Sequence, residues 1–438
     1  MNFIKSNEYR NKIHTLIPGG AHTYSKGDDV FPSTAPAAIS HGKGVYLWDL
    51  DGNKFLDCSM GLTSVSLGHA YEPVINRVVE ELQKGVNFQR PSYIEREMAE
   101  KFLSLLPMHD MIKFAKNGST ATSAAVKLAR AYTNKKVVAF PKEQPFFSYD
   151  DWFISKTACN KGIPDAVESL SLTYKFGDIE SLRELFENNK GEVACVISEP
   201  GSDTKNLSSE YLKAAIELAH ANGALYILDE MITGFKVDFP GAITKYDLRP
   251  DLATWGKGIA NGFSFCALTG TKEIMSIGGI VNSGQEKVFL TSTTHGGETH
   301  SIAACLATID VFENKNVIAH NHSIGNALHT KARECIKNNG LDKYVSVNDT
   351  DWWPIFDFKD KEGKSSLAMK TLIMQEMIKR GVLFSGFFVP SFSHTQEDVN
   401  FFIEQLNDSL KIYSKALEEG YEVYLEGPAI KPVFRKYV

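Results

Sequence analysis

The feature that most restricts the fold is an alternation of apolar strands and helices between about residues 110 and 270. Short apolar, β-branched runs occur at Lys136–Phe140, Val193–Ile197, Leu225–Leu228 and Phe265–Thr269. Helical patterns separate several of them, at 119–133, 178–187 and 208–222. This alternation predicts an α/β fold with a mostly parallel sheet. The all-apolar run Val193–Ile197 is typical of a strand that is covered on both faces.

The two ends of the chain follow a different pattern. Residues 41–57 predict a β-hairpin with its turn at Asp51-Gly52-Asn53. Towards the C-terminus, helices are expected at about 317–338, 365–380 and 395–418, and strands near 344–358 and 381–389. We therefore expect residues 71–320 to form a large domain. A small α+β domain would be built from both chain ends. It would consist of residues 321–438 together with residues 1–70, which form an N-terminal segment and part of this small domain.

Composition excludes several classes of protein. With 43% hydrophobic and 23% charged residues, a chain of 438 residues can bury a large core and is not a disordered tail. A net charge of −6 argues against a nucleic-acid-binding protein. No apolar run approaches the roughly 20 residues needed to cross a membrane. Six cysteines without a CxxC pair predict free thiols, no metal site and a cytoplasmic location.

Three charged residues stand at places where a strand meets a loop. Lys257 lies between two glycines shortly before the run Phe265–Thr269, so its amine is easily approached. Asp229 directly follows one apolar run and Glu199 follows another after a single serine, and α/β sheets bind their ligands at the carboxyl ends of parallel strands. Each has an ordinary alternative when taken singly: a lysine in a surface turn, or a carboxylate that caps a helix or forms a salt bridge.

A fourth motif, Asn117-Gly118-Ser119-Thr120, leads into the helical pattern at 119–133. Free backbone N–H groups, two hydroxyls and the positive end of the helix dipole would make this turn a phosphate-binding site. An ordinary helix cap is the alternative. A phosphate site, an aspartate at a strand end and a later lysine, in that order, describe a pyridoxal phosphate (PLP) site. There the lysine forms a Schiff base and the aspartate pairs with the pyridinium nitrogen.

The motifs also carry a resemblance over almost the whole chain. The most specific are LDEMITGF (228–235), PDLATWGKGIANG (250–262), KNGSTATSAAVKLARAYT (116–133) and TTHGGE (293–298). With these, the chain resembles the class III, fold-type I PLP-dependent aminotransferases, most closely the glutamate-1-semialdehyde aminomutase-like branch. The resemblance implies a large domain with a mostly parallel seven-stranded sheet and a small α+β domain.

The resemblance also implies roles for individual residues. Lys257 would hold PLP as a Schiff base and move the proton, Asp229 would bind the pyridine N–H, and Glu199 would lie near the substrate and the ring. The Gly118–Thr120 turn would hold the phosphate. Thr294 would reach the phosphate of the neighbouring subunit, which implies a homodimer with a shared active site.

Two departures from the family bear on the activity. Phe146 or Phe147 stands where the family places an aromatic residue that stacks on the cofactor, and we expect Phe146 to stack. The segment after Gly381 is shorter than in the aminomutases and lacks their glutamate. We therefore expect an aminotransferase that moves an amino group from a donor, L-glutamate, to a carbonyl acceptor such as a keto sugar of surface-polysaccharide synthesis. An intramolecular aminomutase is the alternative, and a non-catalytic binding protein is a remote one.

Overall fold

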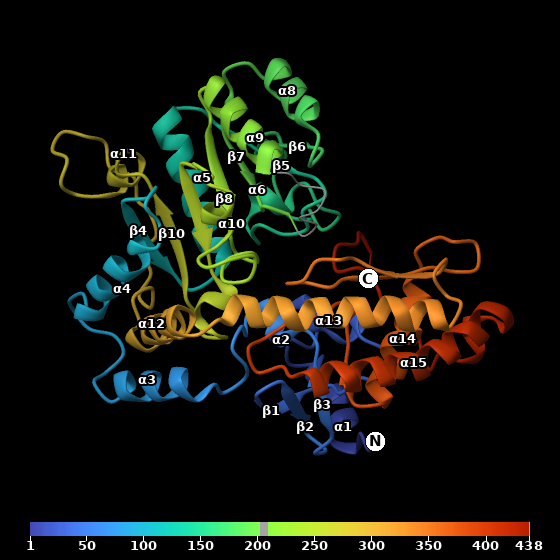
Figure 1. Cartoon of the computed structure of the whole chain (residues 1–438). Helices are drawn as coiled ribbons and strands as arrows, with labels where there is room; N and C mark the ends of the chain where they lie inside the picture. Colours follow the sequence, from blue (N-terminus) through green and yellow to red (C-terminus); the bar gives the residue numbers. More distant parts are fainter. Residues whose placement is uncertain (202–208, 438) are drawn as a thin grey trace. The chain divides into compact units, whose positions relative to one another are not determined.

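The computed structural model describes residues 1–201 and 209–437. The chain divides into two compact units (Figure 1). Unit 1 consists of Met1–Tyr71 and Ala319–Val433, and unit 2 consists of Glu72–Ile318 with the last residues from Phe434 onwards. Among the helices of the described ranges, none combines the length and the apolar character that a membrane span requires.

Unit 2 is built around a seven-stranded sheet with the order β4-β10-β9-β8-β7-β5-β6 (Figure 1). Its strands are β4 (Met111–Ala115), β5 (Val137–Pro141), β6 (Ser171–Tyr174), β7 (Val193–Ser198), β8 (Leu225–Asp229), β9 (Leu252–Trp255) and β10 (Cys266–Gly270). β10 runs antiparallel to β4 and β9, and the other neighbouring pairs are parallel. The sheet confirms the predicted α/β class and its mostly parallel seven-stranded arrangement.

Helices connect these strands. They are α3 (Glu72–Leu82), α4 (Tyr93–Ser104), α5 (Gly118–Thr133), α6 (Asp151–Ile154), α7 (Asp165–Glu168), α8 (Ile179–Asn188), α9 (Ser209–Ala221), α10 (Ala242–Lys245), α11 (Lys272–Met275) and α12 (Thr299–Asn314), with 3₁₀ turns η3 (Lys257–Ala260) and η4 (Ser276–Gly278). α5 packs on the sheet through small residues such as Ala125 and Ala129, which share a core with Ile197 and Ile227. The alanines let the helix lie close to the strands that end at the site described below.

Unit 1 holds two small sheets. One has the order β1 (Ile39–Lys43), β2 (Tyr46–Asp49), β3 (Lys54–Asp57) and β13 (Val382–Leu383); the other pairs β11 (Val345–Val347) with β12 (Phe356–Phe358). Its helices are α1 (Ile4–Ile13), α2 (Met60–Thr63), α13 (Val317–Asn338), α14 (Leu367–Lys379) and α15 (Gln396–Glu419), with 3₁₀ turns η1 (Tyr24–Lys26), η2 (Asp28–Val30) and η5 (Tyr421–Val423). The hairpin predicted at 41–57 is present as β2 and β3.

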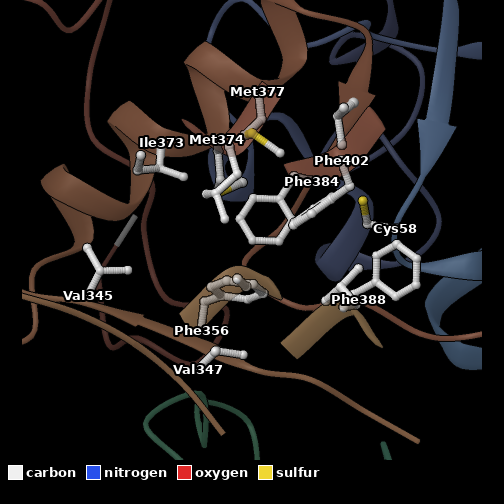
Figure 2. Packing of buried hydrophobic residues seen from close by; sticks show 14 of the residues in the cluster. Cys58, Val345, Val347, Phe356, Ile373, Met374, Met377, Phe384, Phe388 and Phe402 are labelled. Carbon is white, nitrogen blue, oxygen red and sulfur yellow. The ribbon is translucent and has the colours of Figure 1, made fainter. Parts of the chain in front are cut away.

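An aromatic cluster forms the core of unit 1 (Figure 2). The ring centroids of Phe356 and Phe384 are 5.3 Å apart, and those of Phe384 and Phe402 are 5.5 Å apart. Met374 and Met377 of α14 lie beside these rings (Figure 2). The three phenylalanines come from β12, the segment after β13 and α15, so the cluster holds together the C-terminal elements of this unit.

The strand predicted at 381–389 is wrong beyond its first residues, because only Val382–Leu383 form a strand. Gly386 has φ = +96°, a conformation that interrupts extended backbone. Beyond it, the N–H groups of Phe388 and Val389 donate to the carbonyls of Pro354 and Cys58 respectively, rather than to one neighbouring strand. The apolar run that suggested a longer strand is buried because Phe384 and Phe388 belong to the core.

Candidate active site

One pocket of unit 2, with a volume of about 280 Å³, brings together most of the predicted site residues. Its lining includes six of them: Gly118, Ser119, Phe146, Glu199, Asp229 and Lys257. Thr120 and Thr294 are not among the residues that line it. Residues from five separate stretches of the chain therefore meet at one place.

The carboxyl ends of three parallel strands supply the polar side of the pocket. Asp229 is the last residue of β8, Glu199 directly follows β7, and Lys257 lies two residues after β9. β7, β8 and β9 are neighbours in the sheet, so their ends meet at the same edge. This is the edge at which open α/β sheets bind ligands.

Asp229 is a buried carboxylate, and one of its two oxygens is hydrogen-bonded within the protein. Its Oδ1 accepts hydrogen bonds from the Thr254 hydroxyl at 2.8 Å and from the Met231 N–H at 3.0 Å. Within the described part of the chain, both hydrogen bonds to this carboxyl end on Oδ1, which leaves Oδ2 available to a ligand. Burial raises the pKa of Asp229 to about 6, although these hydrogen bonds and nearby Lys257 favour its charged form. The charged carboxylate would be stabilised by a bound cation.

Lys257 begins the turn η3 directly after Gly256. Its φ of +49° is uncommon for a residue with a side chain, and such conformations concentrate at functional sites. Gly256 lies at a crowded position, because a Cβ atom on it would stand 2.3 Å from Met231 Sδ and 2.6 Å from Cys266 Sγ. Burial lowers the pKa of Lys257, while the carboxyls of Glu199 and Asp229 oppose this effect. A larger fraction of the amine is therefore neutral than in water.

Glu199 is buried beside these two groups. Burial, and secondarily the charge of Asp229, raise its pKa to about 8, against an opposing effect of Lys257. Burial therefore favours the protonated form of the Glu199 side chain. The Gln144 side chain accepts a hydrogen bond from the N–H of Glu199 at 2.8 Å and donates one to the carbonyl of Glu199 at 2.9 Å.

Helix α5 begins at the pocket. Asn117 caps it, because its Oδ1 accepts from the Thr120 N–H at 2.9 Å, as helix N-caps commonly do. The buried Ser119 hydroxyl oxygen accepts from the Tyr149 N–H at 3.0 Å, so its own proton remains to be donated. Thr120 donates its hydroxyl to Asn117 at 3.1 Å and lies beside the pocket lining. The turn thus offers the positive helix end and a hydroxyl donor to an anion.

Two phenylalanines line the pocket in different ways. Phe147 is only 2% exposed and packs in the core of unit 2, where its ring lies 5.7 Å from that of Phe153. Phe146 is 46% exposed and contacts Phe153 edge to face at 5.8 Å. Phe146 therefore has a free surface that a bound ring could cover, and Phe147 supports it from within the protein.

Thr294 lies outside this pocket. Its side chain is exposed, and its carbonyl accepts a hydrogen bond from the Asn87 side chain at 3.0 Å. The neighbouring Thr299, at the start of α12, donates its hydroxyl to the carbonyl of Gly85 at 2.9 Å. Segment 294–299 is thus attached to residues 85–87, and its Glu298 also forms an ion pair at 2.9 Å with Lys116 of the pocket lining.

Several functional positions were missed by sequence reasoning. Thr254, Met231, Cys266 and Gln144 shape the pocket or hold its residues. Thr254 offered a weak signal, since it is a hydroxyl on the strand that leads to Lys257. Met231 and Cys266 read as ordinary core residues, and nothing in the sequence places Gln144 beside Glu199.

Comparison with known proteins identifies the family. The sequence model described as aminotransferase class-III matches residues 29–410. The chain is 30% identical over 434 residues to a glutamate-1-semialdehyde 2,1-aminomutase of Thermus thermophilus, with 92% of this chain and 99% of the relative covered. It is 27% identical over 410 residues to a 3-aminobutyryl-CoA aminotransferase of Cloacimonas acidaminovorans, with 92% and 95% covered.

Solved structures share the fold. A FumI protein of Sphingopyxis sp. MTA144, in its PLP internal aldimine form, superposes with a TM-score of 0.85 at 23% identity, covering 96% of this chain and 98% of that one. A transaminase with PLP bound gives the same score and identity over 96% and 99%. PLP, which the sequence predicts, is the cofactor of the family to which these comparisons lead. The chain belongs to the class-III aminotransferases and has the fold-type I architecture of PLP-dependent transferases.

Proposed function

We propose that the protein is a PLP-dependent aminotransferase that moves an amino group from L-glutamate to a carbonyl acceptor, with a keto sugar as the expected acceptor class. The observation that carries the proposal is the meeting of Lys257, Asp229 and the N-terminus of α5 in one pocket. The other predicted site residues, including Thr294, are proposed to have the roles that the resemblance implies for them.

The residues of the pocket fit PLP by their chemistry. A primary amine suits the aldehyde, a buried carboxylate with a free oxygen suits the protonated ring nitrogen, and the start of α5 suits the phosphate. The exposed face of Phe146 suits the flat ring. When bound, PLP supplies an electron-accepting ring that weakens a bond to the substrate α-carbon.

The protein's own residues would then handle protons and orientation. The partly neutral Lys257 amine can accept a proton at Nζ and return it, because burial lowers its pKa. Asp229, oriented by Thr254 and Met231, would keep the ring nitrogen protonated. Glu199, whose protonated form is favoured by burial, can donate a hydrogen bond into the pocket.

The test is a half-reaction. The protein loaded with PLP is mixed with L-glutamate alone, and the absorption spectrum and released 2-oxoglutarate are followed. Loss of the PLP band with release of 2-oxoglutarate is expected, and the charged enzyme is then screened with keto sugars. Lys257→Ala should abolish this exchange while the far-ultraviolet circular dichroism stays unchanged. A Lys257→Ala variant with normal exchange would overturn the proposal.

An aminomutase is the second candidate, because relatives of this chain carry that name. It would convert an amino-aldehyde without a separate donor. The segment after Gly381 favours the transferase, since residues 382–390 contain no carboxylate and Phe384 and Phe388 are buried in the core. Absence of any PLP absorbance after incubation with the cofactor would instead support a non-catalytic binding protein.

A homodimer is part of the proposal. Its support is the exposed segment with Thr294, which lies outside its own pocket and which the resemblance assigns to a neighbouring subunit. Light scattering should give twice the mass of 48.6 kDa. A cytoplasmic location is also proposed, because all six cysteines are free, as thiols are in a reducing compartment.

A further inference from the structure

Gln144 joins two walls of the pocket without lining it. Its Nε2 donates to the carbonyl of Glu199 at 2.9 Å, and its Oε1 accepts from the N–H of Glu199 at 2.8 Å. Both residues are 7% exposed. One side-chain amide thus satisfies both backbone groups of a buried residue, and such groups are costly when left unpaired.

The positions of Gln144 and Glu199 in the sheet explain why the two residues meet. β5 and β7 are parallel neighbours, Gln144 stands three residues beyond the end of β5, and Glu199 directly follows β7. The side-chain amide of Gln144 therefore takes the part that a backbone amide of β5 would play, and it extends the pairing of β5 and β7 beyond the strand ends. A side chain must both donate and accept here, which glutamine does and an aliphatic or ionised side chain does not.

The segment that follows Gln144 is fixed at its other end by helix α5. The Thr122 hydroxyl donates to the carbonyl of Phe147 at 2.9 Å, and the Ser119 hydroxyl accepts from the N–H of Tyr149 at 3.0 Å. Phe146 lies between these attachments and is itself 46% exposed. The position of the Phe146 ring is therefore determined mainly by the hydrogen bonds that hold the chain on either side of it, and less by the burial of the ring itself.

We propose that Gln144 is a positioning residue that holds the Glu199 carboxyl and the Phe146 ring in register across the pocket. This inference rests on the proposed transamination, in which Glu199 and Phe146 face the cofactor and substrate. Without the amide, the backbone of Glu199 needs water as a partner, and the carboxyl becomes more hydrated. The charged groups that face Glu199 are Asp229 and Lys257, and both remain in place.

Two readouts separate positioning from folding. In Gln144→Leu, kcat of the glutamate half-reaction should fall on the order of a hundredfold with little change in KM, as expected for reacting groups misplaced by about 1 Å. The pH midpoint of the absorbance of bound PLP should also move to higher pH, because hydration favours ionised Glu199 and its negative charge holds the proton at the Lys257 nitrogen more tightly. This second readout does not depend on turnover.

Gln375 provides the matched control. It is fully buried in unit 1 and its amide also bonds backbone groups on both sides, donating to the carbonyl of Tyr424 at 2.9 Å and accepting from the N–H of Glu426 at 2.7 Å, besides donating to the Glu376 carboxyl. Gln375→Leu should lose stability yet keep the kcat and the spectral midpoint. Equal shifts in the two leucine variants, or none in Gln144→Leu, would overturn the inference.

Gln144→Glu decides the matter if the leucine variant does not fold. A neutral carboxyl can donate and accept like the amide, so this variant should match wild type at low pH. As the pH rises, the ionised carboxylate can no longer donate to the Glu199 carbonyl, and kcat should fall towards the leucine value. A constant ratio to wild type at every pH would contradict the inference. If wild-type protein itself binds no PLP, it is the proposed function that fails.

Discussion

Replacing Glu230 by glutamine should stabilise the PLP-free protein above neutral pH. The Glu230 carboxyl is fully buried, and it accepts hydrogen bonds from the Ile243 N–H at 2.6 Å and from the Thr233 hydroxyl. Within residues 1–201 and 209–437, no basic side chain forms an ion pair with it. Burial raises its pKa to about 7, although these hydrogen bonds oppose the shift.

The size of the effect follows from this pKa. Since the ordinary value is 4.5, the folded protein holds this proton more tightly than the unfolded chain does. The resulting stability is fully present below pH 4.5 and is lost as the pH rises through about 7. At about 1.4 kcal/mol per pH unit, the loss amounts to about 3 kcal/mol. Glutamine keeps an acceptor for Ile243 and can donate to Thr233, so the variant should avoid this loss.

Equilibrium urea unfolding of the PLP-free protein at pH 5, 6, 7 and 8 measures the effect. The free energy of unfolding of Glu230→Gln, relative to wild type, should increase with pH and favour the variant by up to about 3 kcal/mol at pH 8. A difference that is the same at every pH would refute the reasoning, because only a titrating carboxyl makes it vary.

Glu376 offers a control of opposite sign. It is also buried, but hydrogen bonds from Arg380, Gln375 and Lys379 outweigh the effect of burial and lower its pKa. Its contribution is present above about pH 4.5 and is lost as the pH falls through the lowered pKa. Glu376→Gln should therefore be less stable than wild type at neutral pH, and the gap should close in acid. The same trend in both variants would refute the reasoning.

Four further substitutions can be tested. Phe147→Ala should destabilise the protein by about 3–5 kcal/mol in urea unfolding, because the ring is buried. Phe146→Ala should leave the stability nearly unchanged but weaken PLP binding, measured by tryptophan fluorescence. The reverse pattern would exclude Phe146 as the stacking residue. Gly256→Ala should cost about 1–3 kcal/mol through contact with Met231 and weaken PLP binding, and unchanged values would show that the sulfur atom moves freely. Asn117→Ala removes the cap of α5 and should cost about 1 kcal/mol, with no loss if water replaces it fully.

The strand ends were readable from the sequence because each predicted residue lies next to its own strand. Asp229 and Glu199 stand at the ends of apolar runs, Glu199 after one intervening serine, so the parallel sheet alone predicts that they share an edge. Lys257 and the Gly118–Thr120 turn are local motifs of the same kind. The edge strand β4, by contrast, reads Met111–Ala115 with an exposed lysine at its centre and is not distinguished by apolar character.

Contacts that depend on strand order could not be predicted. Gln144 meets Glu199 only because β5 lies beside β7, although 55 residues separate them in the chain. Met231 reaches Gly118 and Gly256 through the packing of three separate segments. The position of Thr294 in an assembled active site stays a prediction, since it involves a second chain.

The pairing of β13 with β3 has a consequence for the order of synthesis. Leu56 and Asp57 lie beside Val382 and Leu383, about 325 residues later in the chain. At about 5–20 residues per second, a ribosome needs about 16–65 s to cover that distance. During this interval the nascent chain carries β3 with an open edge while all of Glu72–Ile318 emerges. The two halves of unit 1 can therefore pair only after all the strands of unit 2 have been synthesised.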